Sequence, residues 1–169
     1  GAGIATSHAR VGIRSLMLDV DDSRIADGMR RARKVVEDRI KIGRASHDDL
    51  ANMLSFLDTS TDKSHVDDCD VVVEAITEKE EVKTALYKEL AGLMRDDAIL
   101  ASNTSTISIS RMGKSAPHPE RFVGMHFFYP VDRMQLVEVI RGEDTSNETI
   151  ATIVALSKRI KKTPIVVGD

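Results

Sequence analysis

Short apolar segments alternate along this chain with longer amphipathic ones, and this alternation limits its possible folds more than any other feature. The apolar segments are bounded by polar residues or glycine, as buried strands are, and span residues 14–19, 56–60, 70–76, 98–102, 121–128, 135–140 and 164–167. Segments with helical periodicity lie between them. Alternating strands and helices predict an α/β fold with a doubly wound, mostly parallel sheet, whose ligands bind at the carboxyl ends of the strands.

The helical segments carry recognisable start and stop signals. Residues 22–43 are expected to begin with Asp22 or Ser23 as the N-cap and to end at Gly43. Thr145 and Glu148 have the spacing of a capping box for a helix over residues 145–160. The helix predicted over residues 78–94 has an apolar face, which we expect to be buried and which consists of Val82, Ala85, Leu86, Leu90 and Leu93.

Composition excludes several classes of partner. The 24 basic and 27 acidic residues are interleaved and give a formal net charge of −3, which argues against nucleic acid or an anionic membrane surface. No apolar run approaches the roughly 18 residues of a membrane-spanning helix, and the first residues do not have the basic and then apolar segments of a signal peptide, so we expect a cytoplasmic protein without membrane insertion. The histidines and the single cysteine, Cys69, do not have metal-ligand spacing, so no metal site is predicted.

The first residues fit part of a dinucleotide-binding fingerprint. Gly1 fits the third glycine of the pattern G-x-G-x-x-G, and Asp19 follows it by 18 residues, at the end of an apolar run. An acidic side chain there binds the adenosine ribose hydroxyls and favours NAD over NADP. The alternative is that Asp19 only caps the following helix.

His126 and Glu138 are placed symmetrically about a predicted hairpin. Each lies six residues from Asp132, so antiparallel pairing of the two flanking strands would bring their side chains face to face. A carboxylate bound to one imidazole nitrogen leaves the other nitrogen as a general base. The alternative is a solvated histidine and an unrelated glutamate, but a glutamate within an apolar strand needs a partner, which favours the pair.

Hydroxyl and amide side chains follow the strand predicted over residues 98–102. Ser102, Asn103, Thr104 and Ser105 stand in a row at the carboxyl end of this strand, where they could orient an oxygen of a substrate. For the whole run "ASNTSTISIS", residues 101–110, a cluster of N-caps for the following helix is the alternative, but it would account for only one or two of these residues.

Six motifs together resemble a known family. "GAGIA", "LMLDV", "DVVVEAITEKEEVK", "ASNTSTISI", "RFVGMHFFYPVDRMQLVEVIRG" and "KKTPIVVGD" occur in the order and spacing of the NAD-binding domain of L-3-hydroxyacyl-CoA dehydrogenases. The resemblance covers essentially the whole chain and is strongest to the dehydrogenase part of the bacterial fatty-acid oxidation complex alpha chain. It implies a Rossmann-like fold, NAD as cofactor, an acyl-CoA substrate, and a homo-oligomer or multienzyme complex.

The resemblance also implies roles for individual residues. His126 would be the general base, Glu138 its orienting carboxylate, and Ser105 the hydrogen-bond partner of the substrate's 3-oxygen. The cofactor would be bound by Gly1, Asp19, Glu78, Lys83, Ser105 and Tyr129. At Tyr129 the family usually has asparagine, so a bulkier side chain without an amide stands here.

The resemblance further implies that residues 1–169 are an NAD-binding domain truncated at both ends. The first strand and two glycines would precede Gly1, and a helical domain would follow Asp169. We therefore expect the isolated chain to be catalytically inactive. Two alternatives remain: a nucleotide-binding fragment without catalysis of its own, and a dehydrogenase of a related β-hydroxy acid.

Overall fold

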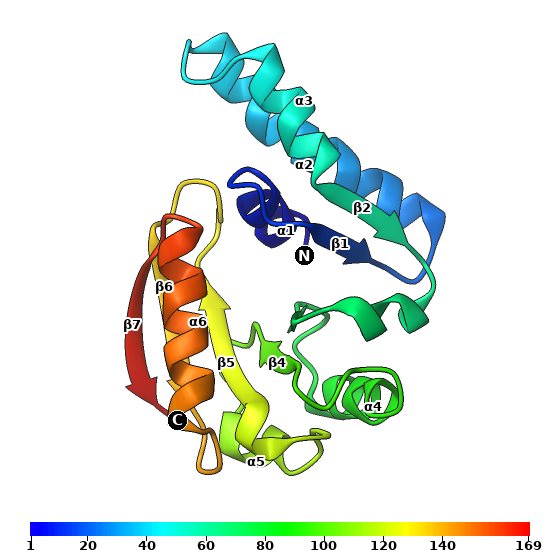
Figure 1. The fold of residues 1–169 in the computed structure, drawn as a ribbon, viewed down its shortest axis with the longest axis vertical. Coiled ribbons are helices and arrows are strands. Elements are labelled where there is room, and N and C mark those ends of the chain that lie inside the picture. The colour runs from blue at the N-terminus through cyan, green and yellow to red at the C-terminus, as the bar shows by residue number, and fades with distance from the viewer. The chain divides into compact units, whose positions relative to one another are not determined.

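A computed structural model describes residues 1–169, which form the predicted alternation of helices and strands (Figure 1). The chain divides into two compact units, of which the first comprises residues 1–62 and 129–134 and the second residues 63–128 and 135–169. The strands form two sheets, β1–β2 in the first unit and β3–β4–β5–β6–β7 in the second. The predicted α/β, Rossmann-like, mostly parallel fold is confirmed.

The first unit is built around one parallel strand pair. Its elements are α1 (Ala2–Ala9), β1 (Ser15–Leu18), α2 (Asp22–Lys41), α3 (His47–Ser55) and β2 (Leu57–Ser60). β1 pairs with β2 from Ser15↔Leu57 to Leu18↔Ser60. A Cβ at Gly28 would lie 2.8 Å from the Met17 sulfur, so α2 and the β1 side chain Met17 pack closely at this glycine. The buried core of this unit comprises Ala9, Met17, Ala32, Val36, Met53 and Leu57.

The predicted N-cap of α2 is wrong by one or two residues. Asp21 has the extended backbone of a cap and its carboxylate accepts a hydrogen bond from Arg24 N, whereas Asp22 already lies in the first helical turn. Asp21, Asp22 and Ser23 follow one another here and can each cap a helix, and their order alone does not decide which one adopts the extended conformation. Gly43 has φ +68°, in the left-handed region expected after a helix end.

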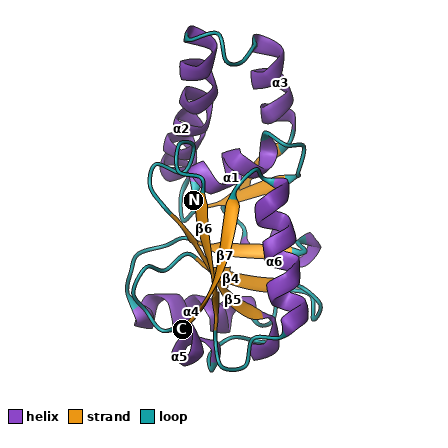
Figure 2. Cartoon of the chain, turned by 90° about the vertical axis from the view of Figure 1, so that its left-hand side faces the viewer, coloured by secondary structure: helices purple, strands orange, loops and turns teal.

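The second unit holds five strands, β3 (Val71–Glu74), β4 (Ile99–Ser102), β5 (Phe122–Phe127), β6 (Leu136–Arg141) and β7 (Thr163–Gly168) (Figure 2). Neighbouring strands are parallel except β5 and β6. The helical elements are η1 (Lys63–Asp68), α4 (Glu80–Leu90), α5 (Ile109–Gly113), η2 (Pro119–Arg121) and α6 (Asn147–Arg159). The parallel strands β3, β4 and β5 therefore point their carboxyl ends toward the same sheet edge, where the polar residues were predicted to gather.

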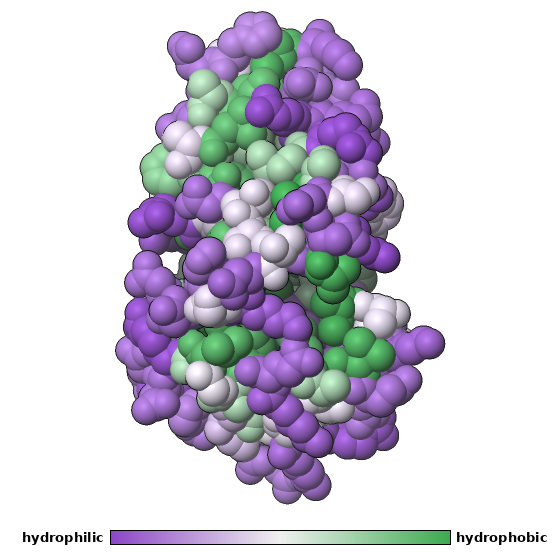
Figure 3. All heavy atoms as spheres, turned by 90° about the vertical axis from the view of Figure 1, so that its right-hand side faces the viewer, coloured by the Kyte–Doolittle hydropathy of each residue, from purple (hydrophilic) through white to green (hydrophobic).

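The predicted buried face of α4 is wrong except at Leu90. Its fully buried residues are Lys83, Tyr87 and Leu90, whereas Val82 is 40% exposed. A lysine normally lies at the surface, but here carboxylates within the second unit pair with it. Figure 3 shows a mostly hydrophilic face of the molecule, with a strip of apolar residues in its upper part and smaller apolar groups below.

The capping box predicted for α6 is also wrong. Ser146 is the N-cap and accepts a hydrogen bond from Thr149 N. Thr145 has other partners, since its hydroxyl donates to Phe122 O and accepts from Gly142 N. Tertiary contacts therefore decide which of two adjacent hydroxyl residues caps the helix.

Candidate functional site

His126 and Glu138 face each other on the antiparallel strands β5 and β6. The two residues are directly opposite in the ladder, and His126 Nδ1 lies 2.8 Å from Glu138 Oε2. The side chains are 16% and 30% exposed, so solvent or a ligand can reach both. The pairing predicted from their symmetry about Asp132 is therefore confirmed, and the alternative of unrelated side chains is excluded.

The hydrogen bond determines which imidazole nitrogen is available. An ionised carboxylate can only accept hydrogen bonds. The Nδ1–H group of His126 is therefore the donor to Glu138, and Nε2 of the neutral ring is left as an acceptor. The ring also packs against Phe128, with centroids 4.6 Å apart and planes tilted by 50°. Both contacts restrict rotation of the imidazole, which is what a general base in a fixed position needs.

The polar run after β4 links this histidine strand to its neighbour. Asn103 Oδ1 accepts a hydrogen bond of 2.8 Å from Phe127 N, the amide next to His126. Thr104 Oγ1 accepts from Ile107 N at 3.0 Å and so shapes the loop that carries Ser105. The N-cap of the following helix, α5, is Ser108. N-capping of α5 therefore accounts for Ser108 within the run of residues 101–110, but not for residues 102–105.

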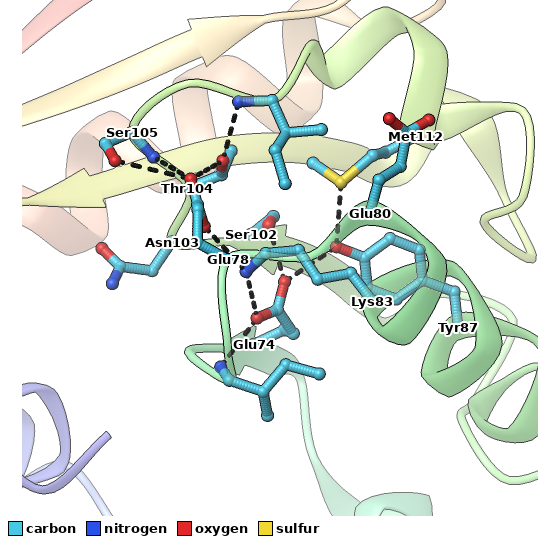
Figure 4. Close-up of polar contacts among 12 residues, drawn as sticks. Glu74, Glu78, Glu80, Lys83, Tyr87, Ser102, Asn103, Thr104, Ser105 and Met112 are labelled. Carbon is cyan, nitrogen blue, oxygen red and sulfur yellow. Dashed lines mark hydrogen bonds and ion pairs between the residues drawn. The ribbon is translucent and has the colours of Figure 1, made fainter.

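Glu78 organises the loop after β4. Its Oε1 accepts hydrogen bonds from Thr104 Oγ1 at 2.5 Å and from Ser105 N at 2.9 Å, and its Oε2 lies 3.4 Å from Lys83 Nζ (Figure 4). Burial raises the pKa of Glu78, but these hydrogen bonds and the Lys83 charge outweigh it and lower the pKa to about 2. Glu78, Lys83 and Ser105, three predicted cofactor-binding residues, are thus brought together.

Sequence reasoning missed the group behind Glu78. Glu74, at the end of β3, accepts hydrogen bonds from Lys83 Nζ at 2.7 Å, from Tyr87 Oη at 2.8 Å and from Ser102 Oγ at 2.7 Å. All of these side chains are buried (Figure 4). Burial and the Glu74 charge raise the pKa of Tyr87, so its phenol remains a donor. A glutamate in a run of valines was the available signal, because such a carboxylate needs partners.

An open groove of about 420 Å³ runs beside these residues in the second unit. Ser105 and Glu138 both line it, together with hydroxyl and apolar side chains. Asp169 closes one side and accepts hydrogen bonds from Ser108 Oγ and from the amides of Ile109 and Ser110. Burial raises the pKa of Asp169, but these hydrogen bonds outweigh it, so the pKa is lowered. The glutamate of the dyad and the serine predicted to bind the substrate therefore line one groove.

The remaining predicted residues belong to the first unit. Asp19 is exposed at the carboxyl end of β1, where its carboxylate accepts a hydrogen bond of 2.8 Å from Val20 N. Because Asp21 caps α2, the alternative that Asp19 is that cap is wrong. Gly1 is the N-cap of α1, and no heavy atom lies within 4 Å of where its Cβ would be. Tyr129 is 91% exposed. Their cofactor roles stay predictions.

No three His, Cys, Asp or Glu side chains are grouped so that they could hold a metal ion. No helix combines the length and the apolar character that crossing a membrane requires.

Comparison with known proteins gives consistent matches over the full chain. Residues 1–169 match the family described as "3-hydroxyacyl-CoA dehydrogenase, NAD binding domain". The chain is 42% identical over 169 residues to the fatty acid oxidation complex subunit alpha of Idiomarina loihiensis. This match covers 100% of the chain but 24% of the relative, so the chain spans about a quarter of that protein's length.

Two crystal structures of dehydrogenases have closely similar folds. (S)-3-hydroxybutyryl-CoA dehydrogenase from Ralstonia eutropha superimposes with a TM-score of 0.98 at 38% identity, over 100% of this chain and 60% of that one. 3-Hydroxybutyryl-CoA dehydrogenase from Escherichia coli K12 superimposes with a TM-score of 0.95 at 31% identity, over 99% of this chain and 35% of that one. With the family match over every residue, the chain belongs to the NAD-binding domain family of 3-hydroxyacyl-CoA dehydrogenases.

Proposed function

We propose that this chain is the NAD-binding part of an oxidoreductase that transfers a hydride between C3 of (S)-3-hydroxyacyl-CoA and NAD in fatty-acid β-oxidation. The observation that carries the proposal is the His126–Glu138 pair, with Ser105 on the groove that Glu138 also lines. Membership in the family and the names of its relatives support the choice of substrate class.

The residues of the site would divide the chemistry as follows. His126 Nε2 takes the proton of the 3-hydroxyl group, and Glu138 stabilises the positive charge that then develops on the ring. The Ser105 hydroxyl donates a hydrogen bond to the 3-oxygen. When NAD is bound, its nicotinamide ring supplies the acceptor for the hydride from C3. In the reverse direction, His126 returns the proton to the oxygen.

The residues present fit a dinucleotide. The exposed Asp19 carboxylate can accept hydrogen bonds from two adjacent ribose hydroxyls, and its charge opposes a 2′-phosphate. Glu78 and Ser105 would bind the nicotinamide half, the completely buried Lys83 would contribute only by holding Glu78, and Tyr129 stands in place of the usual asparagine.

Assembly and location are parts of the same proposal. The match to a subunit of a fatty acid oxidation complex supports a homo-oligomer or multienzyme complex, and such an enzyme would act in the cytoplasm. The alternatives are a fragment that binds nucleotide without catalysis, and action on a related β-hydroxy acid.

Replacing His126 with Gln in the full-length protein tests the proposal. Glutamine has a similar size but cannot take up the proton, so we expect turnover of 3-hydroxybutyryl-CoA to fall by roughly 10²–10⁴-fold. NAD affinity should change little, because the imidazole is proposed to act on the substrate. Turnover within tenfold of the unmodified protein would remove His126 from the role of general base.

A further inference from the structure

The carboxylate of Glu74 is the most fully bonded buried group in the second unit. Glu74 is 3% exposed, and its two oxygens accept four hydrogen bonds, two at each oxygen. Ile76 N and Lys83 Nζ donate to Oε1, and the Tyr87 and Ser102 hydroxyls donate to Oε2. Donors from β4, α4 and the backbone after β3 therefore hold this carboxylate in one orientation.

Lys83 connects this buried carboxylate with the site. Its ammonium group is completely buried and lies 2.7 Å from Glu74 Oε1 and 3.4 Å from Glu78 Oε2. Tyr87 lies four residues further along the same face of α4 and binds the other oxygen of Glu74. Glu74 therefore holds the Lys83 ammonium group in the position in which it pairs with Glu78.

Glu78 passes this constraint on to the loop that carries Ser105. Besides Thr104 Oγ1 and Ser105 N, the amide of Thr106 donates to its Oε1, at 3.3 Å. A carboxylate shared by successive backbone amides fixes their orientation. Any displacement of Glu78 would therefore move the Ser105 backbone.

We propose that Glu74 is a positioning residue, which holds Lys83 so that Lys83 fixes Glu78 and Glu78 fixes the loop of Ser105. This inference rests on the proposed function, in which Ser105 binds substrate and Glu78 lies along the cofactor. A buried ion pair can often be replaced by apolar residues without loss of stability, so stability alone does not explain why Glu74 and Lys83 form one here.

Glu74→Gln removes the charge while preserving the shape. The amide oxygen of glutamine can still accept from Ile76 N and Lys83, and its NH₂ group can donate to the hydroxyl oxygens of Tyr87 and Ser102. Lys83 would then have Glu78 as its only carboxylate partner and would draw it away from the loop amides. The fold is thus kept while the position of Glu78 changes.

Three measurements on the full-length protein test the inference. In Glu74→Gln we expect kcat with 3-hydroxybutyryl-CoA to fall about tenfold and the Kd of NAD to rise at least threefold. Hydrogen exchange at the amides of Ser105 and Thr106 should become at least tenfold faster. The matched control is Thr149→Val, a change of a buried residue on α6, which removes the hydrogen bond from its hydroxyl to Glu120 O and should lower only the melting temperature.

A double-mutant cycle tests whether Glu74 acts through Lys83. In the Lys83→Met background, Glu74→Gln should cause no further loss of kcat, because the link to Glu78 is already absent. Unchanged kcat, NAD affinity and exchange in a folded Glu74→Gln protein would overturn the inference, as would losses that multiply in the double variant. If the unmodified protein does not bind NAD, the proposed function fails, while the exchange rates still decide whether Glu74 holds the loop.

Discussion

Glu138→Gln isolates the contribution of charge to the His126 dyad. The glutamine carbonyl can still accept the Nδ1 proton over 2.8 Å, so the ring is held but the ion pair with a protonated ring is lost. A hydrogen bond to a charged group contributes roughly 1.5–3 kcal/mol, and each 1.36 kcal/mol is tenfold in rate. The expected loss of kcat is therefore roughly 10- to 150-fold, toward the lower end because Glu138 is 30% exposed and water screens its charge.

The assay is the initial rate of NADH formation from 3-hydroxybutyryl-CoA by the full-length protein, with NAD affinity measured separately by titration. The KM should change little, since the ion pair exists only after His126 has taken the proton. Glu148→Gln, a solvent-exposed change on α6, is the matched control and should leave both constants unaltered. A fall in kcat of less than threefold, or a rise in KM with kcat unchanged, would show that the carboxylate does not stabilise the protonated ring.

Three further predictions concern cofactor choice, packing and pH. The unmodified protein should bind NAD at least tenfold more tightly than NADP in calorimetric titrations, and Asp19→Asn should reduce this preference. Equal affinities of the unmodified protein for the two cofactors would refute the role of Asp19 in binding the ribose. Gly124→Ala should destabilise by roughly 1–3 kcal/mol in urea unfolding, because the new Cβ would lie 2.6 Å from Ile140 Cβ; Gly92→Ala, with open space, should not. Glu78 has a pKa of about 2, below its ordinary value, so its stabilisation is present above about pH 4.5 and is lost as the pH falls toward 2. The melting temperature of Glu78→Gln should therefore fall less over this pH range than that of the unmodified protein. An equal fall in the two proteins would contradict the lowered pKa of Glu78.

Local patterns in the sequence predicted the dyad because its geometry depends on strand periodicity. The two strands flank Asp132 symmetrically, and residues opposite each other in an antiparallel pair share a face, so register follows from position alone. The α/β alternation was readable for the same reason, since each strand is a compact apolar run.

The group around Glu74 could not be derived in this way. Its donors come from α4 and β4, which are separate in sequence, and helical periodicity assigns a lysine such as Lys83 to the solvent face. The N-cap of α6 was missed for a related reason, because the Phe122 carbonyl that engages Thr145 lies 23 residues away. Both errors arise where a distant partner overrides a local preference.

The ladder between β5 and β6 determines which changes in chain length this fold can tolerate. His126 and Glu138 are held together by pairing from Gly124↔Ile140 to Phe127↔Val137, and the connection between the strands lies outside that ladder. Insertions in the connection, at residues 129–134, would leave the pair intact. A single-residue insertion within β6 before Glu138 would instead shift the register, so that a valine faces His126 and the glutamate turns to the opposite side of the sheet. Among diverging descendants of this sequence, length variation should therefore accumulate in the connection and be absent from the strands.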